Sequence, residues 1–247
     1  MPSTCWRSCD VAVPMLHGPQ GEDGTVAALC ELAGVPYVGS GVTASAIAMD
    51  KWATKAVAEA VGVRTAPAVL LTPHDASGYR WTHPVVVKPV AAGSSHGVTL
   101  VRDRHALRAA LDAAFCLDTR VLVEDVVVGR EIDLAVLGGT GPTVVMPAAE
   151  IVVSPGTGLF DLATKYDGSA DIRVPAQLSD VERHQLETAA VTVFDALGCQ
   201  GVARVDFFLT ETGVVLNEIN TTPGFTEESQ VPRMFAAAGV NLPQSST

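Results

Sequence analysis

Residues 201–226 read GVARVDFFLTETGVVLNEINTTPGFT and predict a two-stranded hairpin that decides the fold. Side chains alternate between the two faces of a strand, so Arg204 and Asp206 share a face of the first strand. Glu218 and Asn220 share a face of the second strand, and the tight ETG turn would bring the two pairs together. Carboxylate and amide oxygens suit Mg2+, so we expect a metal site here; a solvated face with ordinary ion pairs is the alternative.

Length and composition point to a large core and a small-molecule partner. The chain has 247 residues, 48% of them hydrophobic, which suits one large domain or two or three small ones. A net charge of -11 without a basic run argues against nucleic acid or an anionic membrane as partner. No apolar stretch is long enough to span a membrane. Five scattered cysteines and no apolar signal segment predict a cytoplasmic protein with free thiols, rather than a metal pair at Cys5 and Cys9.

Strands and helices alternate along the chain, which indicates an α/β or α+β class with more than one lobe. The predicted strands are 10–16, 35–40, 65–71, 83–90, 98–101, 119–127, 130–139, a strand pair or hairpin over 144–153, and the two strands of the hairpin above. The predicted helices are 25–34, 44–62, 104–115 and 179–198, the last opened by a capping box of Ser179 and Glu182. Residues 156–173 are polar and aperiodic, and predict a long loop that closes over a site.

Two further segments suggest nucleotide binding. Lys88 ends an apolar strand and precedes the loop AAGSSHG (91–97), whose backbone N–H groups and hydroxyls could meet phosphate oxygens. The loop lacks the GKS or GKT of a P-loop, and a lysine at a strand end often only reaches water. Glu124 and Glu131 are placed to accept hydrogen bonds from a ribose, and the backbone around Glu124 could read an adenine edge; taken singly, each is more typical of a surface acid.

Together the segments resemble the D-alanine:D-alanine ligases of the ATP-grasp superfamily in order and spacing, from about Asp10 to Gly239. The motifs are LHGPQGEDG, YVGSG, AMDK, KPVAAGSSHGV, VEDVVVGREI, GVARVDFF and NEINTTPGFT. The resemblance implies an ATP-grasp fold, in which two α+β lobes sandwich ATP beside a partial N-terminal α/β lobe. The implied domains are a remnant N-terminal lobe (1–46), a central lobe (47–128) and a C-terminal lobe with the metal and substrate site (129–247).

The resemblance also implies the reaction and its ligands. ATP would phosphorylate the carboxylate of one D-alanine, and the amino group of a second would attack the acylphosphate, giving D-alanyl-D-alanine for peptidoglycan precursors. Two Mg2+ ions, with Mn2+ as a substitute, would be held by Asp206, Glu218 and Asn220. The residues implied to contact ATP are Lys51 and Lys88 at the phosphates, Glu124 and Glu131 at the adenosine, and Ser94, Ser95 and Lys165 as further contacts.

The implied catalytic residues lie in the second half of the chain, apart from one serine. Arg204 and the backbone N–H of Gly224 would form an oxyanion hole, and Ser229, helped by Lys165, would bind the carboxylate of the second substrate. Ser94 and Tyr166 belong to a hydrogen-bonded set that places substrate and closes the lid. A tyrosine rather than a histidine at position 166 favours an amine acceptor.

The chain departs from the family at both ends and near the second substrate. Most of the N-terminal lobe, including the glutamate expected to anchor the first substrate, and a closing C-terminal helix are missing from the sequence. A homodimer is therefore not favoured. His96 and the pair Glu227 and Glu228 put the second-substrate pocket in doubt. Three hypotheses stay open: a ligase with a shortened start, a diverged ATP-grasp ligase that joins other amino acids, and a non-catalytic ATP-binding remnant.

Overall fold

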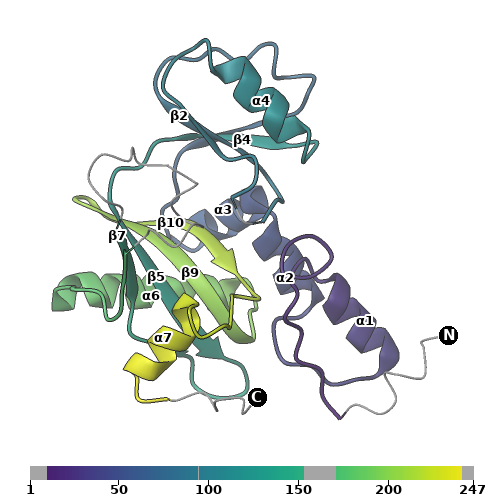
Figure 1. Ribbon diagram of the computed structural model, residues 1–247, viewed down its shortest axis with the longest axis vertical. Helices are drawn as coiled ribbons and strands as arrows, with labels where there is room; N and C mark the ends of the chain where they lie inside the picture. Colours follow the sequence, from purple (N-terminus) through teal and green to yellow (C-terminus); the bar gives the residue numbers. More distant parts are fainter. Residues whose placement is uncertain (1–9, 94, 153–170, 241–247) are drawn as a thin grey trace.

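The computed structural model describes residues 10–93, 95–152 and 171–240. Its two antiparallel sheets form separate lobes, the smaller above the larger in Figure 1, and three helices near the N-terminus lie beside them. The expected α+β class is therefore confirmed. No helix in these three ranges is both long and apolar enough to cross a membrane.

The small lobe is a four-stranded sheet covered on one face by a helix. Its strands follow the order β1-β4-β2-β3 and are β1 (Ala68–Leu71), β2 (Val85–Pro89), β3 (Thr99–Val101) and β4 (Val121–Asp125). Val87 and Val123 pack with Leu111 of helix α4 (Leu107–Phe115) in the core of this lobe. Because side chains alternate along a strand, Lys88 and Glu124 point to the opposite face of this sheet, away from α4.

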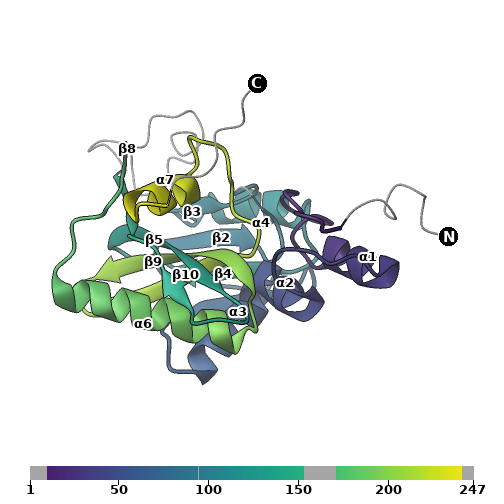
Figure 2. The same ribbon diagram turned by 90° about the horizontal axis from the view of Figure 1, so that it is seen from below.

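The large lobe is a six-stranded sheet between two helices. The main path is β10-β9-β5-β7-β8, and β6 pairs with β5. The strands are β5 (Arg130–Gly138), β6 (Val144–Val145), β7 (Ala149–Val152), β8 (Asp171–Arg173), β9 (Gly201–Thr210) and β10 (Gly213–Asn220). Helix α6 (Asp180–Ala196) covers one face, and helix α7 (Gln230–Ala237) packs on the other (Figure 2).

Alternation along β9 separates the core from the site. Val205 and Phe207 are fully buried against Leu186 and Phe194 of α6, and burying large apolar side chains is the main stabilising contribution to such a core. The intervening residues therefore face the other side of the sheet. The predicted capping box at the start of α6 is confirmed, with Ser179 and the side chain of Glu182 bonded reciprocally.

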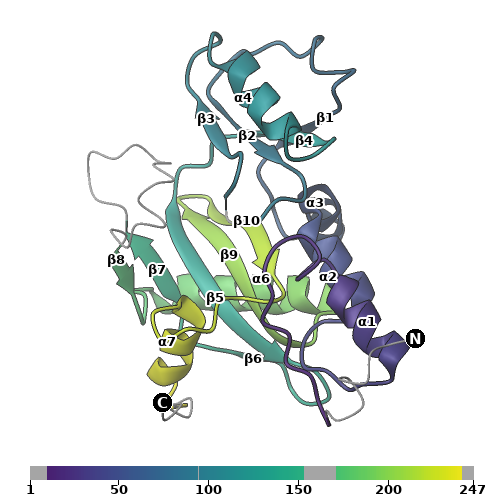
Figure 3. The same cartoon turned by 45° about the vertical axis from the view of Figure 1, so that its right-hand side comes forward.

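The N-terminal helices correct one prediction. The single helix expected over 44–62 is wrong, because α2 (Val42–Met49) and α3 (Lys51–Ala60) are separated at Asp50. Asp50 has extended backbone angles, and its carboxylate accepts a hydrogen bond from Ala53 N at 2.9 Å, so it caps α3 rather than continuing α2. Helix α1 (Thr25–Ala33) precedes them. Ala48 and Ala58 join the core of the large lobe, and Figure 3 shows α3 between that lobe and the small sheet.

Other predictions near the ends were also wrong. The strands expected at 10–16 and 35–40 reduce to one parallel bridge between Ala12 and Tyr37. Val13, expected to be buried, is 60% exposed, because no apolar layer covers it in the described part of the chain. Residues 171–173 of the expected loop form strand β8, whereas 156–170 lie outside the described residues. Helix α7 was not predicted.

Candidate active site

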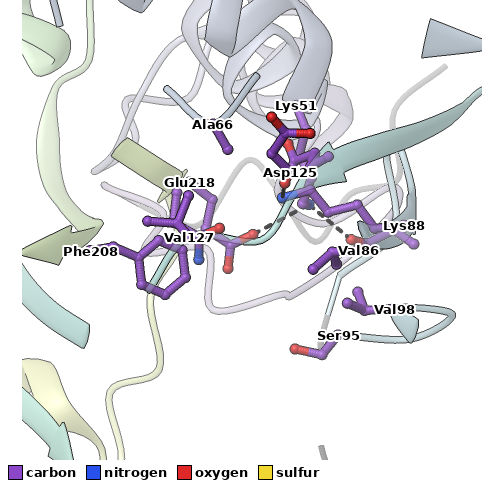
Figure 4. Close-up of a pocket in the computed structure, with 13 residues that line it drawn as sticks. Lys51, Ala66, Val86, Lys88, Ser95, Val98, Asp125, Val127, Phe208 and Glu218 are labelled. Carbon is purple, nitrogen blue, oxygen red and sulfur yellow. Dashed lines mark hydrogen bonds and ion pairs between the residues drawn. The ribbon is translucent and has the colours of Figure 1, made fainter. Parts of the chain in front are cut away.

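A cleft between the two lobes collects side chains from three parts of the chain (Figure 4). Its polar lining comes from helix α3, the small sheet and strand β10, and includes Lys51, Lys88, Glu124 and Glu218. Its apolar lining includes Val86, Val127 and Phe208, which could face a flat aromatic base. A positive and an apolar part in one cleft suit a nucleotide.

Lys88 and Glu124 form a buried ion-pair cluster with a third residue, Lys55 of α3. Lys88 Nζ lies 2.6 Å from Glu124 Oε2, and Lys55 Nζ lies 2.9 Å from Glu124 Oε1. Burial opposes ionisation of this carboxyl, but the ammonium groups of Lys88 and Lys55 hold the pKa of Glu124 below its ordinary value. Both oxygens of Glu124 are thus already engaged by cations.

Lys51 crosses the cleft at the first turn of α3. Its Nζ lies 3.3 Å from Glu218 Oε2 and donates a hydrogen bond to Ala92 O at 3.2 Å. Ala92 precedes the serine-rich loop, in which Ser95 lines the cleft with a left-handed backbone, φ 54°. Lys51, Lys88 and Ser95, which were all predicted to contact ATP, therefore lie on one cleft.

The hairpin brings together the four residues predicted from residues 201–226. Glu218 pairs with Asp206 and Asn220 with Arg204 across β10 and β9. A bulge at Asn217, which was not predicted, shifts the register between Leu216 and Glu218. Without it, the charged residues of β10 would not face those of β9.

Arg204 organises the acids of this sheet face. Its Nε and Nη2 each donate to one oxygen of Asp206 at 2.7 Å, and its Nε lies 3.8 Å from Asp133 Oδ2. Burial alone would lower the pKa of the guanidinium, but the Asp206 carboxylate outweighs this effect and raises the pKa above its ordinary value. Arg204 is therefore a permanent cation. Asn220 Nδ2 also donates to Asp206 Oδ2, at 3.2 Å.

The predicted metal set can be tested on its donor chemistry. Within residues 10–93, 95–152 and 171–240, no three His, Cys, Asp or Glu side chains are grouped to hold a metal by themselves. Asp206, Glu218 and Asn220 supply two carboxylates and one amide instead. This partial set fits Mg2+, which commonly keeps one or two carboxylates and fills its octahedron with phosphate oxygens and water.

Gly224 and Ser229 lie together after the end of β10. A Cβ added at Gly224 would sit 2.9 Å from Ser229 Oγ, so a larger residue there would displace the Ser229 hydroxyl. Ser229 Oγ is 2.8 Å from Thr226 Oγ1. Ser229 is the N-cap residue of helix α7. Gly224 and Ser229, which were predicted in separate roles, are therefore neighbours in the structure.

A smaller pocket adjoins the cleft and contains Glu22. It is lined by Glu22, Gly93, Glu218 and Asn220, among others. Burial raises the pKa of Glu22 above its ordinary value. The pocket places a carboxylate within the reach of a small ligand beside the metal set.

Four predicted ATP and substrate residues are not among those that line the cleft in the described part of the chain. Ser94, Lys165 and Tyr166 lie outside the described residues. Glu131 lies on β5 opposite Phe208 of β9, on the sheet face of the hairpin acids. It does not line the cleft described above.

Two charged residues of the site were not predicted. Lys55 follows Lys51 by one helical turn, a spacing that was visible in the sequence and puts both on one helix face. Asp133, which is 1% exposed, follows Glu131 by two positions on a strand and pairs with Asp206 in register. The alternation of REIDLAV could have shown it.

Two antiparallel α+β lobes with a cation-lined cleft and an acidic hairpin define the ATP-grasp class. The family model described as D-ala D-ala ligase C-terminus matches residues 57–245, and that described as D-ala D-ala ligase N-terminus matches residues 3–40. The chain therefore belongs to the D-alanine–D-alanine ligase family, as the sequence predicted.

Curated relatives agree with this family. The D-alanine–D-alanine ligase of Frankia casuarinae is 47% identical over 244 residues, which are 95% of this chain and 63% of the relative. That of Mycobacterium avium is 47% identical over 96% of this chain and 67% of its own length. The chain thus spans about two thirds of the length of these relatives.

Solved structures give the same fold. The VanG D-Ala:D-Ser ligase of Enterococcus faecalis has a TM-score of 0.84 at 37% identity, covering 94% of this chain and 69% of the other. The D-alanine–D-alanine ligase of Bacillus anthracis complexed with ATP has a TM-score of 0.79 at 29% identity, covering 95% and 76%.

Proposed function

We propose that this chain carries the catalytic part of an ATP- and Mg2+-dependent ligase that joins two D-alanines into D-alanyl-D-alanine for peptidoglycan precursors in the cytoplasm. One observation carries the proposal: Lys51 and Lys88 line one cleft with Glu218, which pairs with Asp206 in the acidic hairpin. Cations on one side and oxygen ligands on the other suit a triphosphate with its metal ions.

The nucleotide is assigned to the first cleft. Lys51, Lys88 and the serine-rich loop bind phosphate oxygens, and the backbone near Glu124 reads the adenine edge beside Val86, Val127 and Phe208. Glu131 is still assigned to the ribose, although it lies opposite Phe208 on the neighbouring sheet and not in the lining of this cleft. Asp206, Glu218 and Asn220 hold Mg2+, which would supply positive charge where negative charge develops during phosphoryl transfer.

The first D-alanine is assigned to the small pocket beside this cleft. Glu22 faces its ammonium group, and Arg204 and the N–H of Gly224 stabilise the oxygen that becomes negative when the acylphosphate is attacked. Arg204 is suited to this role because its bonds to Asp206 fix its orientation before any substrate binds.

The second substrate is assigned to the region of Ser229. Its hydroxyl and the first N–H groups of α7 can donate hydrogen bonds to a carboxylate. A second candidate acceptor is D-serine, because the structure of a D-Ala:D-Ser ligase matches this chain at 37% identity. D-serine would still present an amine nucleophile.

Phosphate release with a panel of acceptors tests the proposal. The chain is incubated with ATP, Mg2+ and D-alanine alone, and then with D-alanine plus D-serine or D-lactate, and products are separated by mass spectrometry. We expect dipeptide formation coupled to phosphate release. Binding of ATP without any ligation product would support an ATP-binding remnant instead, and a non-alanine product would support a diverged ligase.

A further inference from the structure

Helix α3 connects the two sides of the nucleotide cleft through residues on one face. Ala58 belongs to the core of the large lobe, so the helix is held there. Lys51 reaches Glu218 of β10, whereas Lys55 reaches Glu124 of β4 in the small lobe. Lys55 also donates a hydrogen bond to Ala66 O at 2.7 Å, just before β1.

The cluster of Lys55, Glu124 and Lys88 is buried to an unusual degree for three charges. Their side chains are 6 to 7% exposed. One carboxylate between two ammonium groups leaves a net charge of +1, and only Lys88 and Glu124 of the three line the cleft. A buried excess charge is costly unless an opposite charge meets it, so the cluster favours an anion in the cleft.

Lys55 determines whether the net charge of this cluster is positive or zero. Without it, Glu124 would neutralise Lys88 at 2.6 Å, and the cleft would lose the positive charge at this point. With it, one oxygen of Glu124 is occupied at 2.9 Å, and the field of Lys88 is not cancelled.

We propose that Lys55 is a positioning residue for nucleotide binding: by sharing Glu124 with Lys88, it keeps the buried cluster positive and Lys88 available to phosphate. The inference rests on the proposed function, since it takes the cleft as the ATP site. Lys55 acts through Glu124 and Lys88 and touches no ligand.

A charge role and a scaffold role for Lys55 predict opposite results in a double variant. Lys55→Met leaves Glu124 and Lys88 as a neutral pair, so the affinity for ATP should fall by at least about tenfold. Lys55→Met combined with Glu124→Gln removes one positive and one negative charge, restores the net charge of +1, and should bind ATP more tightly than Lys55→Met alone. A scaffold role predicts that the double variant is worse, because a second buried contact is lost.

The experiment is calorimetry with ATP and Mg2+ on the full chain and its variants, beside ligand-observed NMR with adenosine. Lys55→Arg should retain most of the affinity. Arg108→Met, which removes an exposed cation from α4, is the matched control for net charge. Adenosine affinity should be unchanged in Lys55→Met, because adenosine carries no phosphate.

The outcomes separate this inference from the proposed function. Failure of the unsubstituted chain to bind ATP would overturn the proposed function and the inference with it. Normal ATP binding by Lys55→Met, or a double variant weaker than Lys55→Met, would overturn the inference alone. If Lys55→Met does not fold, Lys55→Gln, which removes the charge, is compared with Lys55→Arg, which keeps it: Lys55→Gln should bind ATP about tenfold more weakly than Lys55→Arg, and equal affinities would overturn the inference.

Discussion

Lys51 and Glu218 form an ion pair across the cleft, with Nζ and Oε2 3.3 Å apart. Lys51 is assigned to phosphate and Glu218 to metal. Without ligands, the negative Glu218 takes the place of phosphate beside Lys51, and the positive Lys51 takes the place of the metal beside Glu218. The pair keeps both charges compensated in the ligand-free protein, and binding of ATP with Mg2+ would replace it with two new contacts. Two effects of Glu218 can therefore be separated experimentally.

Glu218→Gln should lower turnover with Mg2+ by at least about a hundredfold, because the residue acts on charge that develops during phosphoryl transfer. The affinity for ATP without Mg2+ should be equal or higher, because Lys51 loses a competing carboxylate. Steady-state kinetics and calorimetry measure the two effects. Glu59→Gln, at the exposed end of α3, is the control for loss of a carboxylate. Near-normal turnover of Glu218→Gln would refute the metal assignment.

Arg204→Met should reduce both stability and activity. The change removes the guanidinium that Asp206 and Asp133 share in a buried site, and such losses cost about 3 to 5 kcal/mol in free energy of unfolding. Urea denaturation measures it. Adding Asp206→Asn should recover part of the stability, because it removes one buried carboxylate. It should not recover turnover. An unchanged urea midpoint for Arg204→Met would contradict the buried network.

Gly224→Ala tests the close approach to Ser229. The new Cβ would lie 2.9 Å from Ser229 Oγ, so the Ser229 hydroxyl must turn away, and turnover should fall by up to about a hundredfold if the new methyl group also disturbs the Gly224 N–H that stabilises the oxyanion. ATP affinity should stay unchanged. Gly78→Ala is the matched control, because its Cβ would meet Asp75 O at an ordinary 3.4 Å. Equal turnover of the two variants would remove Gly224 from the mechanism.

Local patterns predicted much of the site. The period of two in a strand placed Arg204 with Asp206 and Glu218 with Asn220, but the pairing of the two faces also needs the bulge at Asn217, which the turn does not specify. The capping box of α6 was readable because its two partners are three residues apart. Such features depend on neighbours in sequence.

Features that depend on distant partners were not predicted. Lys55 and Glu124 lie far apart in the sequence, on helix α3 and strand β4, and nothing in either segment specifies the other. The apolar run at 10–16 indicates a preference for burial but does not supply the layer that would cover Val13. Asp50 did carry a local signal, since aspartate is a common N-cap; the apolar periodicity on both sides of it obscured the break.

Glu150→Gln should make the stability of the large lobe less dependent on pH. Arg130 Nε and Nη2 donate to the two oxygens of Glu150 at 2.7 and 2.9 Å, and these hydrogen bonds hold the pKa of Glu150 below its ordinary value of 4.5. A carboxyl whose pKa is lower in the folded state contributes stability above 4.5 and loses it as the pH falls through the folded-state pKa.

The expected result follows from that sign. At pH 7, Glu150→Gln should be less stable by about 1 kcal/mol, a modest value because the Arg130 side chain is 37% exposed. The difference should shrink below pH 4.5 and vanish once Glu150 is protonated in the folded protein. Thermal unfolding followed by circular dichroism between pH 7 and pH 3 measures it, and Asp112→Asn, in an exposed helical pair with Arg108, is the control. A difference that stays constant down to pH 3 would show that Glu150 contributes through packing rather than through its charge.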